Sequence, residues 1–145
     1  MTNLNSLTKN IVVLGASGWI GKNFVSSLSE LQNVNLFLYS SKEPKTIEIK
    51  KDLTYKTIPI EHINNLDINR VDSLIDLAFP TQEKIEELGK DSYLEQANNL
   101  LVLKKDFLNQ FKPLNIINIS SGAVHWKNNK SNLYSKKKIE EEQLY

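Results

Sequence analysis

The feature that most constrains the fold is a glycine pattern directly after a short apolar run. Residues 11–14 read Ile-Val-Val-Leu, and Gly15, Gly18 and Gly21 follow at once. A continuous apolar run is typical of a strand buried on both faces of a parallel sheet. Helical spacing of apolar residues begins at Trp19. The pattern therefore predicts a buried strand, a tight turn and a helix.

Each glycine of this loop has a physical use. Gly15 permits the tight turn, Gly18 leaves room where a pyrophosphate approaches the backbone, and Gly21 lets helix and strand pack closely. The helix then presents free amide groups to the phosphates. The alternative is a tight turn without a ligand. The expected dinucleotide contacts in this loop are Gly15, Ser17, Gly18, Trp19, Ile20 and Gly21.

Strand and helix patterns alternate along the rest of the chain. Further strands are expected at residues 34–39, 57–60, 71–77 and 115–120, and helices at 19–31, 81–111 with a break near Gly89, and 131–145. Residues 40–56 are expected to form a loop or a hairpin, and 61–70 to contain a helical turn. This alternation is typical of an α/β fold. We expect one domain over residues 1–145, a doubly wound parallel sheet of about five strands in the order 3-2-1-4-5, with helices on both faces.

Composition excludes several classes of function. The net charge is +1 and Arg70 is the only arginine, so nothing favours nucleic acid as a partner. The chain has no cysteine and two histidines, so we expect no metal site. It has no apolar run of about 18 residues and no apolar leader, so we expect no membrane span and a cytoplasmic protein.

The end of the second expected strand bears on the choice of cofactor. It reads Tyr39-Ser40-Ser41-Lys42, with no carboxylate before Glu43. In dinucleotide sites an acidic residue here usually bonds the adenosine ribose. A carboxylate would repel a 2′-phosphate, whereas hydroxyls and a lysine would accept one. We therefore expect these four residues to contact NADP or NAD, with NADP favoured. The alternative is that Lys42 is an exposed loop lysine and that Tyr39 or a backbone group holds the ribose.

A second group of candidate residues follows the last expected strand. The serine pair Ser120 and Ser121 stands where this strand ends, Tyr134 comes thirteen residues after Ser121, and Lys138 four residues after that. Positions i and i+4 share one face of a helix. An ammonium near a phenol favours the phenolate, which can then exchange a proton with a substrate hydroxyl or carbonyl. The pair alone is common by chance, but its place after a serine pair and the glycine loop favours chemistry.

Together these segments resemble the extended branch of the short-chain dehydrogenase/reductase superfamily, the NAD(P)-dependent epimerase/dehydratase family. The resemblance rests on residues 15–21, 76–79, 119–126 and 134–138, with His125 and Trp126 standing where the family has tyrosine and glycine. It implies that Ser121, Tyr134 and Lys138 are catalytic, with Lys138 also holding the nicotinamide ribose.

The resemblance also places the Asp76-Leu77-Ala78-Phe79 segment beside the adenine ribose, so Leu77 and Ala78 are expected cofactor contacts. Two residues of this segment depart from the family pattern, because Asp76 replaces a usual histidine and Phe79 replaces an alanine. No single residue matches the asparagine that the family carries on the preceding helix. The residues near that position are Gln96, Asn98 and Asn99.

Family members are about twice as long and continue into a carboxy-terminal substrate domain, which this chain is expected to lack. The resemblance implies an epimerase, dehydratase or reductase acting on a nucleotide sugar or related polyhydroxy substrate. The alternative is a non-catalytic dinucleotide-binding sensor or scaffold. We expect a homodimer that uses the open edge at residues 115–119 and the last helix. The charge block 136–142 is expected to be mostly a solvated helix face.

Overall fold

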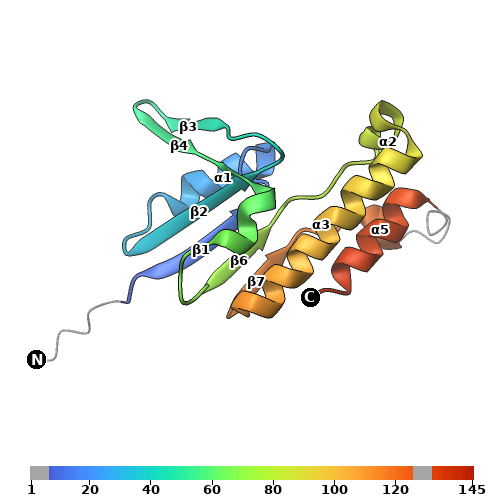
Figure 1. Ribbon diagram of the computed structural model, residues 1–145. Helices are drawn as coiled ribbons and strands as arrows, with labels where there is room; N and C mark the ends of the chain where they lie inside the picture. Colours follow the sequence, from blue (N-terminus) through green and yellow to red (C-terminus); the bar gives the residue numbers. More distant parts are fainter. Residues whose placement is uncertain (1–6, 126–131) are drawn as a thin grey trace, which may run out of the picture.

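Five parallel strands form the central sheet of this protein, whose computed structural model describes residues 7–125 and 132–145. The order in space is β5-β2-β1-β6-β7 (Figure 1). Counted along the chain within this sheet, that is the predicted order 3-2-1-4-5. The strands are β1 (Lys9–Leu14), β2 (Val34–Ser40), β5 (Ile58–Pro59), β6 (Ser73–Asp76) and β7 (Asn115–Asn118).

Helices and a hairpin surround this sheet. The hairpin strands β3 (Thr46–Lys50) and β4 (Leu53–Lys56) pair antiparallel in a sheet of their own, within the region expected to be a loop or hairpin. The expected long helix is divided at Gly89, which has φ +78°. The helices are α1 (Trp19–Leu28), η1 (Ile60–Asn65), α2 (Glu83–Leu88), α3 (Lys90–Phe111), α4 (Gly122–His125) and α5 (Leu133–Glu142).

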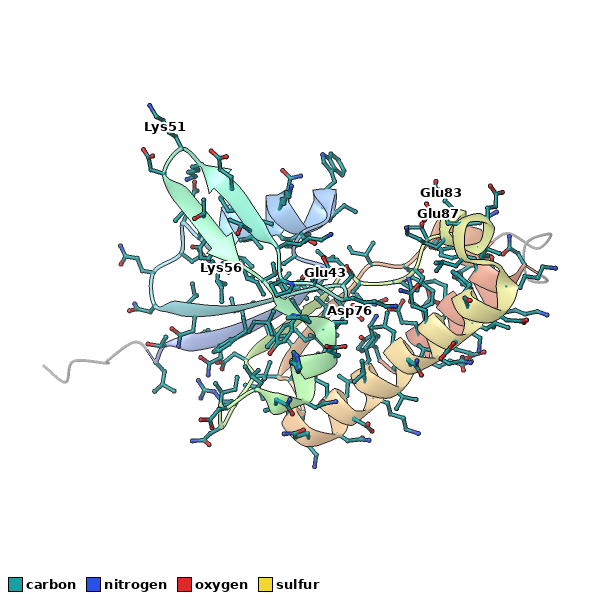
Figure 2. The ribbon with its side chains drawn as sticks, turned by 45° about the horizontal axis from the view of Figure 1, so that its top comes forward. Glu43, Lys51, Lys56, Asp76, Glu83 and Glu87 are labelled. Carbon is teal, nitrogen blue, oxygen red and sulfur yellow. The ribbon has the colours of Figure 1, made fainter. Side chains whose placement is uncertain are left out.

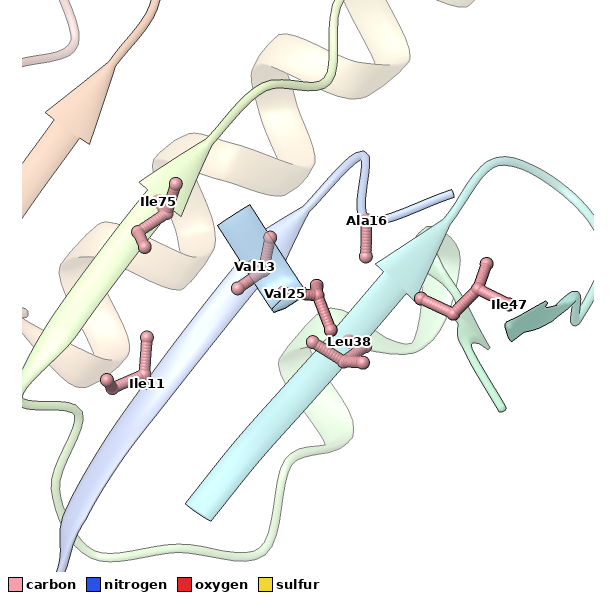
Figure 3. Packing of buried hydrophobic residues seen from close by; sticks show 7 residues of the cluster. All are labelled: Ile11, Val13, Ala16, Val25, Leu38, Ile47 and Ile75. Carbon is pink, nitrogen blue, oxygen red and sulfur yellow. The ribbon is translucent and has the colours of Figure 1, made fainter. Parts of the chain in front are cut away.

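Residues 11–14 of β1, near the centre of the sheet, are buried on both faces, as the unbroken apolar run predicted. Ile11 and Val13 of β1 pack with α1 and the hairpin, where Val25 and Ile47 complete the cluster shown in Figure 3. The alternate residues of β1 point to the other face, toward η1 and α3, where Phe107 is fully buried. This alternation explains why no polar residue interrupts the run.

The two edges of the sheet differ. Pro59 stands in β5 at one edge, a position where the missing amide of a proline leaves no strand unpaired. At the other edge, the consecutive residues Ile116 and Ile117 of β7 are 39% and 45% exposed. Because neighbouring residues of a strand point to opposite faces, neither face of β7 is fully covered by the described residues. None of the helices in the described part of the chain is both long and apolar enough to cross a membrane.

Candidate functional site

The glycine loop connects β1 to α1 and is held by backbone contacts. The amides of Gly15 and Ala16 both donate to the carbonyl of Tyr39, at 3.0 Å. Gly15 has φ +78°, and a Cβ there would lie 2.9 Å from the backbone carbon of Leu77. A Cβ on Gly21 would lie 2.2 Å from the Gly15 oxygen. The fold therefore requires glycine at these two positions, for the turn and for close packing.

Gly18 differs from its two neighbours in the pattern. Its φ is −71°, an ordinary value for any residue, and the nearest atom to a Cβ there is the Gly15 oxygen at 3.4 Å. The fold thus has room for a side chain at Gly18, and the glycine leaves the backbone there open to a ligand. No side chain caps the amino terminus of α1, and no acidic residue lies in its first turn. The loop therefore fits the diphosphate of a dinucleotide.

Ser17 and the first residues of α1 flank this position. Ser17 is half-buried, Ile20 is 41% exposed and Trp19 is 83% exposed. The Trp19 ring is largely in solvent and does not belong to the core. Its place beside the loop remains compatible with contact to a ligand.

The end of β2 offers fewer groups to a ligand than its sequence suggested. The Tyr39 side chain is buried in the core, and this burial raises the pKa of its phenol. The Ser40 hydroxyl is also buried, where it donates to the Glu43 carbonyl at 2.7 Å and accepts from Thr57. Ser41 and Lys42 are exposed. The side chains of Ser41 and Lys42 are therefore the available candidates for a 2′-phosphate contact.

The segment after β6 links the glycine loop to the expected catalytic helix. Leu77 and Ala78, both half-buried, pass against Gly15. The Phe79 ring then meets Tyr134 edge-on at 6.1 Å, and the Lys138 Nζ lies 4.9 Å from the centre of the same ring. Tyr134 and Lys138 therefore share one face of α5, as their spacing predicted.

Ser121 approaches this region from β7. It is half-buried and immediately precedes α4, which packs against α5. The neighbouring Ser120 donates its hydroxyl to the carboxylate of Glu142. The Asn132 side chain caps α5 by accepting the Tyr134 amide at 2.8 Å. The serine pair and the tyrosine thus belong to packed neighbouring elements.

Beneath Phe79 lies a buried group of charges that the sequence did not reveal, here called the ion cluster: Asp76, Lys104, Lys138 and Glu141. The Lys104 ammonium lies 2.7 Å from Asp76 Oδ2 and also binds Glu141, whose second oxygen binds Lys138. All four residues are at most 5% exposed. Two positive and two negative charges balance, so the cluster is neutral. Figure 2 labels Asp76 at the end of β6.

The ion cluster corrects the expectation that the charge block 136–142 is mostly solvated. It also accounts for the aspartate at position 76. Lys138 and Glu141 belong to the block expected to be solvated, yet both are buried. Asp76, which replaces the family's usual histidine, is the partner of Lys104 and also accepts from the Tyr145 hydroxyl. Burial and the negative charge of Asp76 raise the pKa of Tyr145.

Two side chains of α3, Tyr93 and Gln96, carry buried polar groups. Tyr93 is buried and donates to the Pro80 carbonyl at 3.1 Å. Burial, with smaller contributions from Tyr134 and Glu141, raises the pKa of Tyr93 to about 12. Gln96 differs from the other two candidates for the helix asparagine, because its amide oxygen is buried and has no hydrogen-bond partner among the described residues. Asn98 and Asn99 are exposed.

Solved structures of sugar epimerases share this fold. The UDP-N-acetylglucosamine 4-epimerase of Bacillus cereus matches with TM-score 0.58 and 20% identity, over 94% of this chain and 49% of its own. The UDP-glucuronic acid 4-epimerase of Bacillus cereus, in complex with NAD, matches with TM-score 0.60 and 20% identity, over 94% and 51%.

A thiolation-reductase di-domain from an archaeal non-ribosomal peptide synthetase matches with TM-score 0.63 and 13% identity, over 94% of this chain and 47% of that one. The chain therefore spans about half the length of these three structures. No protein-family model matches the sequence, and no curated protein sequence matches it. The comparisons show that the chain has the Rossmann-type fold of these enzymes.

Proposed function

We propose that the chain is the NAD(P)-binding part of an epimerase, dehydratase or reductase of the extended short-chain dehydrogenase/reductase type. The substrate class we propose is a nucleotide sugar or a related polyhydroxy compound. The observation that carries the proposal is the open Cβ position of Gly18 at the uncapped start of α1. The NAD bound to the UDP-glucuronic acid 4-epimerase of the same fold supports it.

The roles of the residues follow from their places around this loop. The loop Gly15–Gly21 holds the diphosphate, with Leu77 and Ala78 behind it. Ser41 and Lys42 favour NADP over NAD, because they are exposed at the end of β2. The nicotinamide, when bound, gives or accepts hydride. Tyr134 exchanges a proton with the substrate oxygen, Ser121 orients that oxygen, and Lys138 holds the nearby ribose. A sensor or scaffold that binds the dinucleotide without chemistry is the alternative.

A valine at position 18 tests the phosphate site. Gly18→Val places methyl groups where the diphosphate would lie, and its backbone conformation suits valine. We expect a loss of more than about 100-fold in affinity for NADH and NADPH, or about 2.7 kcal/mol. Fluorescence titration of the reduced cofactors measures this loss, and a urea unfolding curve shows whether the variant folds.

The matched control is Gly122→Val, since a Cβ there has no atom of the described residues within 4 Å and lies outside the loop. ADP is the ligand for this control, because ADP lacks the nicotinamide half and reports on the glycine loop alone. Gly122→Val should bind ADP as the unmodified chain does, and Gly18→Val should not. Equal ADP affinity in Gly18→Val and the unmodified chain would contradict the proposed site.

We also propose that the protein is a cytoplasmic homodimer. The open edge of β7, with Ile116 and Ile117 exposed, has neither a lysine nor a proline to discourage pairing. Multi-angle light scattering measures the mass in solution. A mass of two chains supports the proposal, whereas a stable single chain at high concentration contradicts it.

A further inference from the structure

The two lysines of the ion cluster differ in what they can still bind. An ammonium group has three N–H donors. Lys104 uses its donors on Asp76, Glu141 and the Ala78 carbonyl, so it has none left for a ligand. Among the described residues, the Lys138 ammonium has one acceptor, the carboxylate of Glu141. Lys138 is therefore the member of the ion cluster that can donate to something outside it.

Glu141 is the bridge between these two lysines. One carboxylate oxygen accepts from Lys104 and the other from Lys138. Lys104 is in turn anchored to the end of β6 through Asp76 at 2.7 Å. The position of the Lys138 ammonium is thus tied to the central sheet through Glu141 and Lys104.

The rest of α5 contributes little to this placement. The buried residues of α5 are Ser135, Lys138 and Glu141, spaced three apart, so a polar stripe faces the protein. Apolar contacts would let a helix slide, whereas charged hydrogen bonds fix both distance and direction. The helix is therefore held in register by the Glu141–Lys104 pair, which joins α5 to α3 and also leaves Glu141 in contact with Lys138.

We propose that Glu141 is a positioning residue, which holds the Lys138 ammonium beside Tyr134 for the nicotinamide half of the dinucleotide. The inference rests on the proposed function. Glu141 itself contacts no ligand and acts through Lys138. Without its carboxylate, Lys138 would be a buried cation with no anionic partner. It would then move toward water or lose its proton, and in both cases leave its place.

The test compares two ligands in the full chain. Glu141→Gln should weaken NADH and NADPH binding by about tenfold, the effect of losing one charged hydrogen bond. The affinity for ADP should stay within about twofold, because ADP reaches only the glycine loop. The matched control is Glu140→Gln, which removes an exposed carboxylate from the same helix, where it pairs with Lys137. This control should change neither affinity.

A second background keeps the test decisive if Glu141→Gln folds poorly. Lys138→Met combined with Glu141→Gln leaves one buried cation, Lys104, and one buried anion, Asp76, so the charges still balance. If Glu141 acts through Lys138, the double variant should bind NADH no more weakly than Lys138→Met alone.

Three results would overturn the inference: an unchanged NADH affinity in Glu141→Gln, an equal loss for NADH and ADP, or a further loss in the double variant. The last two would mean that Glu141 only supports the fold. If the unmodified chain binds neither ADP nor NADH, the proposed function fails and this inference fails with it. Binding of ADP and NADH by the unmodified chain therefore distinguishes failure of this inference alone from failure of the proposed function.

Discussion

The glycine loop and the ion cluster are the two halves of one candidate site, and they are built in opposite ways. The loop consists of residues close together in sequence and is held by backbone groups, such as the Tyr39 carbonyl. The ion cluster joins side chains from β6, α3 and α5, up to 65 positions apart, through charged hydrogen bonds. The structure of the loop therefore requires positions without side chains, whereas the structure of the ion cluster requires particular charged side chains.

This difference predicts opposite responses to substitution. At the loop, substitutions that add atoms should lower stability. At the ion cluster, the loss should come from removing a charge, because a partner is then left buried without compensation. Both regions are buried against the same segment, residues 76–79, so stability measurements in one protein compare them directly.

The largest effect is expected at Lys104. Lys104→Met keeps most of the buried side-chain volume but leaves Asp76 buried without a cationic partner, and it leaves Lys138 as the single cation beside two carboxylates. We expect a loss of about 3–5 kcal/mol in the free energy of unfolding. Urea unfolding followed by circular dichroism measures it. Lys105→Met, an exposed position on the same helix, is the control and should change stability by less than about 0.5 kcal/mol. Equal stability of the two variants would contradict the structure of the cluster.

A smaller effect is expected at Gly21. Gly21→Ala adds one carbon 2.2 Å from the Gly15 oxygen, which is backbone and cannot rotate away. We expect a loss of about 1–3 kcal/mol, the usual cost of overpacking, measured by the same urea curves. Gly18→Ala is the matched comparison, since its Cβ would meet only ordinary contact at 3.4 Å. If both alanine variants were equally stable, the distinction between a packing glycine and a ligand glycine would be wrong.

Sequence patterns predicted the sheet and the loop because these depend on local spacing. The apolar run 11–14, the helical period after Trp19 and the proline at position 59 each indicate one element, and the alternation of strands and helices predicts parallel pairing. The strand order is the one expected from the doubly wound fold type. The predicted boundaries of the strand at residues 57–60 were too wide, since β5 contains only Ile58 and Pro59. A short edge strand gives no periodicity to read.

The ion cluster could not be predicted in the same way, because the sequence around a charged residue does not identify a partner that is distant in the chain. One local pattern did exist. Ser135, Lys138 and Glu141 repeat every three residues on a helix with few apolar side chains. Such a helix must bury some polar face if it packs at all. The identity of the partners, Lys104 and Asp76, required the structure.

The neutrality of the ion cluster constrains which substitutions this protein can accept during evolution. Losing any one of its four charges strands an opposite charge in the interior, so single substitutions pass through a destabilised intermediate. Losing one cation and one anion together restores balance. Homologues are therefore expected to carry the four charges as a set or to lack them in oppositely charged pairs.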